Sequence, residues 1–268
     1  MVIIQRRLFG VIRYRKAFFP TLEQANELIN GLQLNDIVRF VYPVANAFDS
    51  SYCAHVSQVA TVCIDLRQDL DTIFKRMEAR SCRQRIRKAE KCLERIRIVG
   101  KSENAIVQFL DMYNDFARAK GTVPPVSREH LDLYLRVSDL TLLYLDDRPM
   151  CGHVTLRDEE LKHVVLMFSG SRRFEGKEDA SMCSALGRFL HWYELQRYRE
   201  QGMAVYDFGG IGHENLRANF NQFKLSFGGD IVSEYRYTFS GARSLARLGV
   251  DAYIRLRNSK ASRLLPHV

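Results

Sequence analysis

The sequence has little of several features that would assign it to a special class. Only 6 of its 268 residues are proline, it has no low-complexity tract, and no apolar run reaches the ~18 residues of a membrane span. Met1–Arg7 is not the start of an apolar leader segment. The six cysteines include no Cys-x-x-Cys pair, which argues against a zinc knuckle or a thioredoxin-type site. We therefore expect a cytoplasmic protein with reduced thiols, no membrane span and no metal site.

Acidic residues are also fewer than basic ones. The chain has 31 of them against 40 lysines and arginines, which gives a formal charge of +9. Lys75–Lys101 alone contains eleven basic residues and three acidic ones. This balance favours an acidic partner such as nucleic acid, a phosphorylated ligand or anionic lipid. The hydrophobic fraction of 46% is that of an ordinary globular protein, which excludes disorder as the main state.

The N-terminal part shows three local signals. Ile3–Tyr14 has the composition of a strand. Thr21 and Gln24 form a capping box that starts a helix, which ends at Gly31. Ile37–Pro43 indicates a second strand.

Apolar periodicity predicts the elements from residue 59 onward. The first is a strand Val59–Asp65, followed by apolar helix faces over Leu70–Met77 and Ile86–Ile96, which a break at Arg80–Arg83 separates, and by helices Ser102–Lys120 and Ser127–Val137. A three-stranded meander comes next, over Leu140–Leu145, Cys151–Arg157 and Lys162–Phe168. The last elements are a helix Asp179–Gln201, a strand Ala204–Phe208, a helix Glu214–Phe227, a strand Ile231–Phe239 and a helix Ser240–Arg257. A strand–helix–strand unit inside a mostly antiparallel sheet predicts an α/β fold with a mixed (α+β) sheet and helices on both faces.

The stretch Val205–Gly212 is the most informative for function. Its adjacent glycines, Gly209 and Gly210, follow a predicted strand and precede a predicted helix. Glycine permits positive φ and close approach of a ligand to the backbone, and a helix N-terminus can bind an anion. A simple tight turn is the alternative. The stretch is not a dinucleotide fingerprint, because the third glycine is missing.

Three motifs, in family order, then resemble the FemABX family, which transfers amino acids from aminoacyl-tRNA onto peptidoglycan precursors. Arg80–Lys91 resembles the family's R-x-x-I-R-K-A helix, and Tyr206–Ile211 and Phe223–Gly229 resemble the other two motifs. The resemblance covers Val59 to Phe239. It implies a GNAT acyltransferase fold with one complete lobe plus a short N-terminal partial lobe. The implied division is residues 1–58, a GNAT-like lobe over 59–240, and a helical extension over 241–268.

The resemblance also implies where the acyl donor binds. Phe168 and Ser169 end the meander, where GNAT sheets open to admit the donor, and Arg173 and Gly176 match the pyrophosphate loop before the long helix. Glu178 stands where that loop usually has a small residue, and an acid there either repels pyrophosphate or only caps the helix. This favours aminoacyl-tRNA slightly over acyl-CoA as the donor. Both are co-substrates, and we expect no tightly bound cofactor.

Lys224 and Asp207 are the expected catalytic residues. Lys224 matches the family's Phe-Lys position and would stabilise an oxyanion or a phosphate, with a surface lysine as the alternative. Asp207 would orient the acceptor amine or act as a base, with a turn cap as the alternative. The residues expected to bind substrates are Tyr206, Gly209, Gly210, His213, Phe223, Arg85, Arg87 and Lys88. Tyr206 and Asp207 alternate along a strand, so only one should face the cleft. We treat His153 and His163 as structural.

The resulting hypothesis is a bacterial-type acyltransferase of cell-envelope biosynthesis. It would move an aminoacyl or acyl group onto an amine carried by a cell-envelope precursor or a small molecule, with tRNA as a partner. One alternative is an acyl-CoA-dependent N-acyltransferase acting on polysaccharides, sugars or amino acids. The other is a non-catalytic basic module that binds RNA or a protein partner, with Arg85, Arg87 and Lys88 on a merely solvated helix face.

Overall fold

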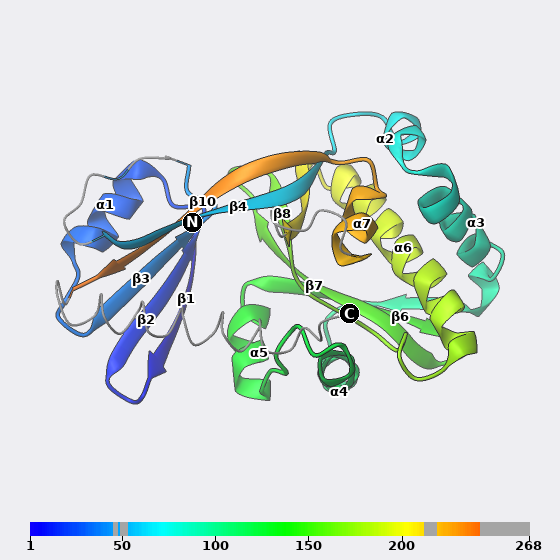
Figure 1. The fold of residues 1–268 in the computed structure, drawn as a ribbon, viewed down its shortest axis with the longest axis horizontal. Helices are drawn as coiled ribbons and strands as arrows, with labels where there is room; N and C mark the ends of the chain where they lie inside the picture. The colour runs from blue at the N-terminus through cyan, green and yellow to red at the C-terminus, as the bar shows by residue number, and fades with distance from the viewer. Residues whose placement is uncertain (45–47, 49–52, 212–218, 242–268) are drawn as a thin grey trace, which may run out of the picture. The chain divides into compact units, whose positions relative to one another are not determined.

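The computed structural model describes residues 1–44, 48, 53–211 and 219–241 (Figure 1). The chain divides into two compact units, one formed by residues 1–59 with 233–268 and the other by residues 60–232. It passes between the units within β4 (Cys53–Asp65) and again within β10 (Asp230–Ser240). Among the described residues, no helix has the length and apolarity needed to cross a bilayer.

The first unit contains a sheet with the strand order β1-β2-β3-β10. Its elements are β1 (Val2–Leu8), β2 (Ile12–Phe18), α1 (Leu22–Asn30) and β3 (Asp36–Val41). The prediction of one strand over Ile3–Tyr14 was wrong. Phe9 and Gly10 adopt φ of 51° and 74°, and this left-handed turn folds the segment into an antiparallel hairpin.

The predicted capping box of α1 is confirmed. The Thr21 side chain accepts a hydrogen bond from the Gln24 backbone N–H, and the Gln24 side chain accepts one from the Thr21 N–H. Gly31 ends the helix, as expected. Two orphan backbone donors are satisfied in this way, which is why so short a helix starts where it does.

The second unit carries the mixed sheet that the sequence predicted. Its strand order is β4-β9-β8-β7-β6-β5. The strands not yet named are β5 (Ile96–Val99), β6 (Ser138–Leu145), β7 (Arg148–Asp158), β8 (His163–Ser171) and β9 (Val205–Ile211). Among the described strands of this unit, only β8 and β9 run parallel, and α6 (Lys177–Glu200) connects them. The predicted meander is β6-β7-β8.

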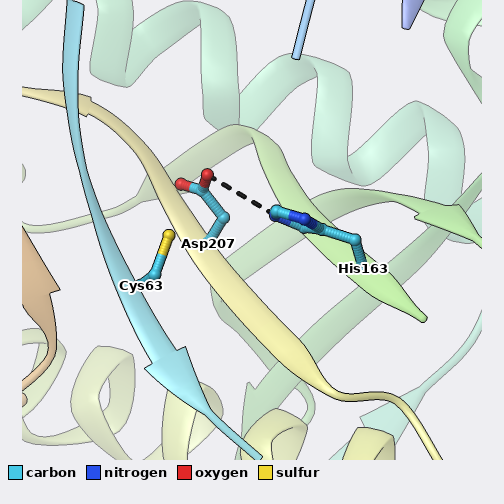
Figure 2. Close-up of side chains that lie close together, drawn as sticks. All are labelled: Cys63, His163 and Asp207. Atoms are coloured by element: carbon cyan, nitrogen blue, oxygen red, sulfur yellow. Dashed lines mark ion pairs between the residues drawn. The ribbon is translucent and has the colours of Figure 1, made fainter. Parts of the chain in front are cut away.

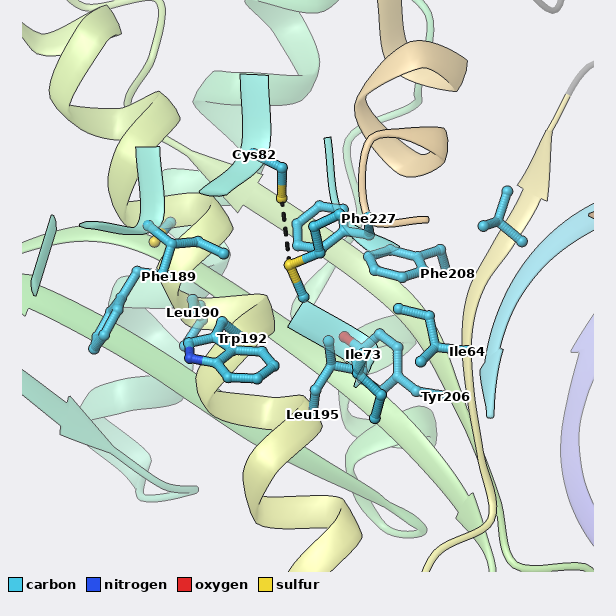
Figure 3. Packing of buried hydrophobic residues seen from close by; sticks show 14 of the residues in the cluster. Ile64, Ile73, Cys82, Phe189, Leu190, Trp192, Leu195, Tyr206, Phe208 and Phe227 are labelled. Atoms are coloured by element: carbon cyan, nitrogen blue, oxygen red, sulfur yellow. Dashed lines mark hydrogen bonds between the residues drawn. The ribbon is translucent and has the colours of Figure 1, made fainter. Parts of the chain in front are cut away.

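Helices cover both faces of this sheet (Figure 1). Leu143 of β6 packs into a core with α6 and α3 (Gln84–Glu90), whereas its neighbours Leu142 and Tyr144 pack toward α4 and α5. The bounds of the other helices are α2 (Leu70–Arg76), α4 (Glu103–Lys120), α5 (Arg128–Leu135) and α7 (Asn219–Leu225). The core on the α6 side is aromatic, and Figure 3 shows Phe208 beside Phe227, with ring centroids 4.8 Å apart.

One predicted apolar helix face is partly a strand. α3 ends at Glu90, and Ile96 belongs to β5 at the edge of the sheet. A 3₁₀ turn over Leu93–Arg95 links α3 to β5. Because this turn is itself helical, the apolar pattern of α3 continues through it and hides the end of the helix. The helices do break near the predicted position, because Met77 and Glu78 are extended and end α2, and a π-helical turn over Ala79–Arg83 then leads directly into α3.

The glycine pair also behaves differently from the prediction. β9 does not end at Phe208 but continues through Gly209 and Gly210 to Ile211. Gly209 has φ 74°, and the register with β4 shifts beside it, which is a β-bulge rather than a strand exit. The beginning of the helix expected from Glu214, and all but the first two residues of the helix expected over 240–257, lie outside the described residues.

Candidate functional site

A cavity of about 470 Å³ opens where β8 and β9 part. The two strands pair only over His163–Val165 and Val205–Asp207. Beyond that point Leu166–Ser171 of β8 and Phe208–Gly210 of β9 line the cavity, together with side chains of α4, α6 and α7. Strands that separate leave backbone N–H and C=O groups without a ladder partner, so these groups are available to a ligand.

The cavity brings together about half of the predicted site residues. Those that line it are Phe168, Ser169, Arg173, Gly209, Gly210, Phe223 and Lys224. Those that lie in the described part of the chain but do not line it are Tyr206, Asp207, Gly176, Arg85, Arg87 and Lys88. His213 and the side chain of Glu178 lie outside the described residues.

The Lys224 side chain is held on the cavity wall by hydrogen bonds and does not extend freely into solvent. Its ammonium donates to the carbonyl oxygens of Gly209 at 3.0 Å and Gly210 at 2.8 Å. The bulge turns these two carbonyls toward it. The φ of 74° favours glycine here, and a Cβ on Gly209 would also make a tight contact of 3.2 Å with the Leu166 carbonyl oxygen.

The described residues of the cavity wall are cationic and include no carboxylate. Lys120, Arg173, Arg188 and Lys224 all line it. Burial and the nearby charge of Arg173 lower the pKa of Lys120, and burial lowers the pKa of Arg188. Cations held this close destabilise one another, and an anionic ligand would relieve that repulsion. The wall is therefore suited to a phosphate-bearing substrate.

Two stacked imidazoles lie at the floor of the cavity. The rings of His153 and His191 are 4.1 Å apart between centroids, and both line the cavity. His153 Nδ1 lies 2.8 Å from Glu194 Oε2, and the Tyr206 hydroxyl donates to the same oxygen at 2.7 Å. Glu194 is fully buried. A carboxylate that is removed from solvent needs hydrogen-bond donors, and His153 and Tyr206 supply them to Glu194.

The network determines which nitrogens carry protons. Tyr206 has one hydroxyl proton and gives it to Glu194, so its oxygen accepts the 2.9 Å hydrogen bond from Nδ1 of His191. Burial lowers the pKa of His191 far below its ordinary value, which keeps this ring neutral, and burial with the Glu194 charge raises the pKa of Tyr206. His153 directs its Nδ1 proton at Glu194, which leaves Nε2 to accept a proton. Carboxylate-backed imidazoles of this kind act as general bases.

Sequence reasoning missed this network. His153 was expected to be structural, and Lys120, Arg188, His191 and Glu194 were not considered. The spacing of His191 and Glu194, three residues apart on α6, places both on one helix face and was a usable signal. The distance from His153 on β7 to that face depends on tertiary packing and has no sequence signature.

The basic run divides into a paired and an unpaired part. Arg76, Arg95 and Arg97 form ion pairs with aspartates. In the described part of the chain, the α3 cations Arg85, Arg87 and Lys88 form none. Arg85 and Lys88 instead donate to the hydroxyl of Ser181 on α6, each at 3.0 Å, and the Arg87 guanidinium lies over the Phe74 ring. Their positive charge remains available to an external anion.

Asp207 faces away from Tyr206, as strand alternation predicted, but neither residue lines the cavity, whereas one of them was expected to face it. Its Oδ1 accepts hydrogen bonds from the Thr61 hydroxyl and from the Gly209 backbone N–H, so it supports the local turn. Its neighbours on the same side are Cys63 and His163, as Figure 2 shows. The carboxylate is fully buried and outside the cavity.

The cavity has one position with spare room. Gly187 of α6 lines it, and a Cβ built there would meet nothing within 4 Å. A glycine inside a helix costs ~1 kcal/mol relative to alanine. The open space at Gly187 therefore belongs to the volume that a ligand can fill.

Comparisons with known proteins agree with this architecture. The sequence profile of the acetyltransferase (GNAT) domain matches residues 61–224. FemX is similar in structure at 9% identity and a TM-score of 0.63, with 92% of this chain and 85% of that chain covered. The C-terminal domain of a protein named as a putative lysylphosphatidylglycerol synthetase from Agrobacterium fabrum is similar at 14% identity and a TM-score of 0.57, with 94% of this chain and 84% of that chain covered. L-PGS from Bacillus licheniformis is similar at 12% identity and a TM-score of 0.52, with 95% of this chain and 85% of that chain covered. None of the curated proteins matches. At these identities the structural similarity shows a shared fold. The fold that the resemblance to FemABX proteins implied is therefore confirmed.

Proposed function

Because the chain belongs to the acetyltransferase (GNAT) family, we propose that this acyltransferase moves an aminoacyl group from aminoacyl-tRNA onto an amine. The observation that carries the proposal is the cavity between β8 and β9, which combines a cationic wall with a carboxylate-backed imidazole at its floor. The wall suits a phosphate-bearing donor, and the floor suits removal of a proton from the acceptor.

The preference for tRNA rests on charge outside the cavity. Arg85 and Lys88 lie against α6 at Ser181, so their charge extends the basic surface beyond the cavity wall. A nucleic-acid donor presents many phosphates over such a distance, whereas a small carrier presents few. Among the structural neighbours, the name lysylphosphatidylglycerol synthetase also records a lysyl group in its product.

The chemistry follows from the two parts of the cavity. The acceptor nitrogen attacks the donor's carbonyl carbon, a C–N bond forms, and the bond to the carrier oxygen breaks. His153 Nε2 takes the proton that the nitrogen loses and returns it to the leaving oxygen, while Glu194 stabilises the imidazolium. Lys224 supplies positive charge where the oxyanion develops. Since an aminoacyl ester is already activated, positioning does much of the remaining work.

An acyl-CoA donor is the second candidate. Arg173 lines the cavity, and Gly176 is the N-cap of α6, whose first backbone N–H groups are suited to a pyrophosphate. The same acceptor and base would serve this reaction. The third hypothesis, a non-catalytic binding module, is set aside because the family is one of acyltransferases. We propose a cell-envelope precursor or a small amine as the acceptor.

The donor is tested by thermal unfolding of the full chain with total tRNA, with acetyl-CoA and with neither. A ligand at 100 times its Kd stabilises the folded state by ~2.7 kcal/mol, which is several degrees for a protein of this size. We expect tRNA to raise Tm more than acetyl-CoA does. A shift with acetyl-CoA alone would replace the tRNA proposal by the CoA-dependent one. Transfer of a labelled amino acid from charged tRNA to an added amine then tests the reaction itself.

A further inference from the structure

We propose that Cys63, His163 and Asp207 bind a zinc ion on the face of the sheet opposite α6. One thiol, one imidazole and one carboxylate come from the neighbouring strands β4, β8 and β9, and their ligand atoms lie within 4.8 Å of one another (Figure 2). This donor set of sulfur, nitrogen and oxygen is typical of zinc. It lies outside the cavity and does not depend on the proposed function.

The carboxylate of Asp207 is arranged as a metal ligand should be. Oδ1 is held by the Thr61 hydroxyl and by the Gly209 N–H at 2.6 Å. Oδ2 is buried and has no hydrogen-bond partner among the described residues, although it faces His163. A buried carboxylate oxygen is costly without a partner, whereas outer donors that orient the other oxygen are what ligating carboxylates have.

The distance between Asp207 and His163 separates metal binding from simple hydrogen bonding. Asp207 Oδ2 and His163 Nε2 are 3.6 Å apart, which is too long for a hydrogen bond. Two ligands on a tetrahedral zinc, at 2.0–2.2 Å from the ion, are separated by ~3.3–3.6 Å. The geometry therefore leaves room for an ion between these two atoms.

The other cluster of possible ligands lacks this geometry. His153 and Glu194 are already in hydrogen-bond contact at 2.8 Å, and the rings of His153 and His191 are stacked at 29°. Lone pairs of stacked imidazoles lie in nearly parallel planes and do not converge on one ion. In contrast, Asp207 Oδ2 and His163 Nε2 face each other without a hydrogen bond, and Cys63 beside them is only half-buried.

Zinc binding would convert the Cys63 thiol to a thiolate and release its proton to solvent, with the ion bonded to sulfur, His163 Nε2 and Asp207 Oδ2. Water would take the fourth position. The ion would join the three strands next to the point where β8 and β9 part. Through the Gly209 N–H on Asp207, it would also stiffen the bulge whose carbonyls bind Lys224.

The test uses the full chain without an affinity tag, stripped with chelator and then loaded with Zn²⁺ or Co²⁺. We expect one zinc per chain after dialysis and, with cobalt, a thiolate-to-metal charge-transfer band. Cys63→Ser and His163→Asn should lose the zinc and the band, and Cys92→Ser, a matched control at another half-buried cysteine, should keep both. Wild-type protein that binds no metal, or a band that survives in Cys63→Ser, would overturn the proposal.

Alkylation of the wild-type protein tests the same proposal without a variant that could misfold. Zinc should protect Cys63 from iodoacetamide by at least tenfold, as measured by peptide mass spectrometry, and leave the labelling of Cys92 as it is. Equal labelling of Cys63 with and without zinc would show that its sulfur does not bind the ion.

Discussion

Two polar clusters on opposite faces of one sheet use the same chemical groups in different ways. On the α6 side, Glu194 and His153 touch at hydrogen-bond distance within a buried network, in which Glu194 Oε1 also has no hydrogen-bond partner among the described residues. On the other side, Asp207 and His163 stand 3.6 Å apart beside Cys63, with one carboxylate oxygen lacking a hydrogen bond. The first arrangement can move a proton, and the second can hold an ion. The longer distance between carboxylate and imidazole, together with the thiol of Cys63, distinguishes the second chemistry from the first.

The largest expected effect separates the two histidines by rate. His153→Gln removes the base and should lower transfer by ~10²–10⁴-fold in single-turnover measurements. His163→Gln should cost far less rate and lose bound zinc instead, while His55→Gln, in the other unit, serves as the control. Equal losses of rate in the His153 and His163 variants would erase the distinction between the clusters.

Lys224 tests the link between the Cys63 cluster and the cavity wall, since Gly209 gives its N–H to Asp207 and its carbonyl accepts from Lys224. Lys224→Ala should lower kcat/KM at least ~10-fold, about 1.4 kcal/mol of barrier, without unfolding the chain. Circular dichroism checks the fold. Wild-type turnover in this variant would remove Lys224 from the mechanism.

Acid titration distinguishes the clusters by stability. His191 has a pKa lowered by burial, so below pH 6.5 the unfolded chain binds a proton that the native chain refuses. In EDTA, the free energy of unfolding should fall as the pH drops from 6.5 toward the folded pKa, by up to ~1.4 kcal/mol per pH unit. His191→Gln should reduce this slope. Any further acid sensitivity that appears only with zinc would belong to the Cys63 cluster, because protons compete with the metal.

The smallest effect concerns the α3 cations, which lie in neither cluster. Replacing Arg85, Arg87 and Lys88 by glutamine should flatten the salt dependence of tRNA binding by ~0.7–0.9 log units per lost phosphate contact. Filter binding over a range of salt concentrations measures the slope. An unaltered slope would show that this helix face is only solvated, and Lys75→Gln provides a single-charge comparison.

Local signals in the sequence were sufficient for most elements, and half of the predicted site residues line the cavity. The capping box at Thr21, the meander and the alternation of Tyr206 with Asp207 all depend on neighbouring residues, and they were predicted correctly. The bulge at Gly209 was not, because it depends on the register with β4. The same limit applies to function, since His153 and Glu194 are far apart in the chain and meet only through packing of α6 on β7.

Gly187 has a consequence for anyone who wishes to redesign the enzyme. Changes that reshape an active site commonly weaken a protein, because catalytic pockets are built from strained or unsatisfied groups. Here the vacant wall position is also a helix position where alanine is intrinsically preferred over glycine. A graded series of side chains at Gly187 could therefore narrow the range of ligands that the cavity accepts while the scaffold gains stability, so selectivity and robustness would change in the same direction.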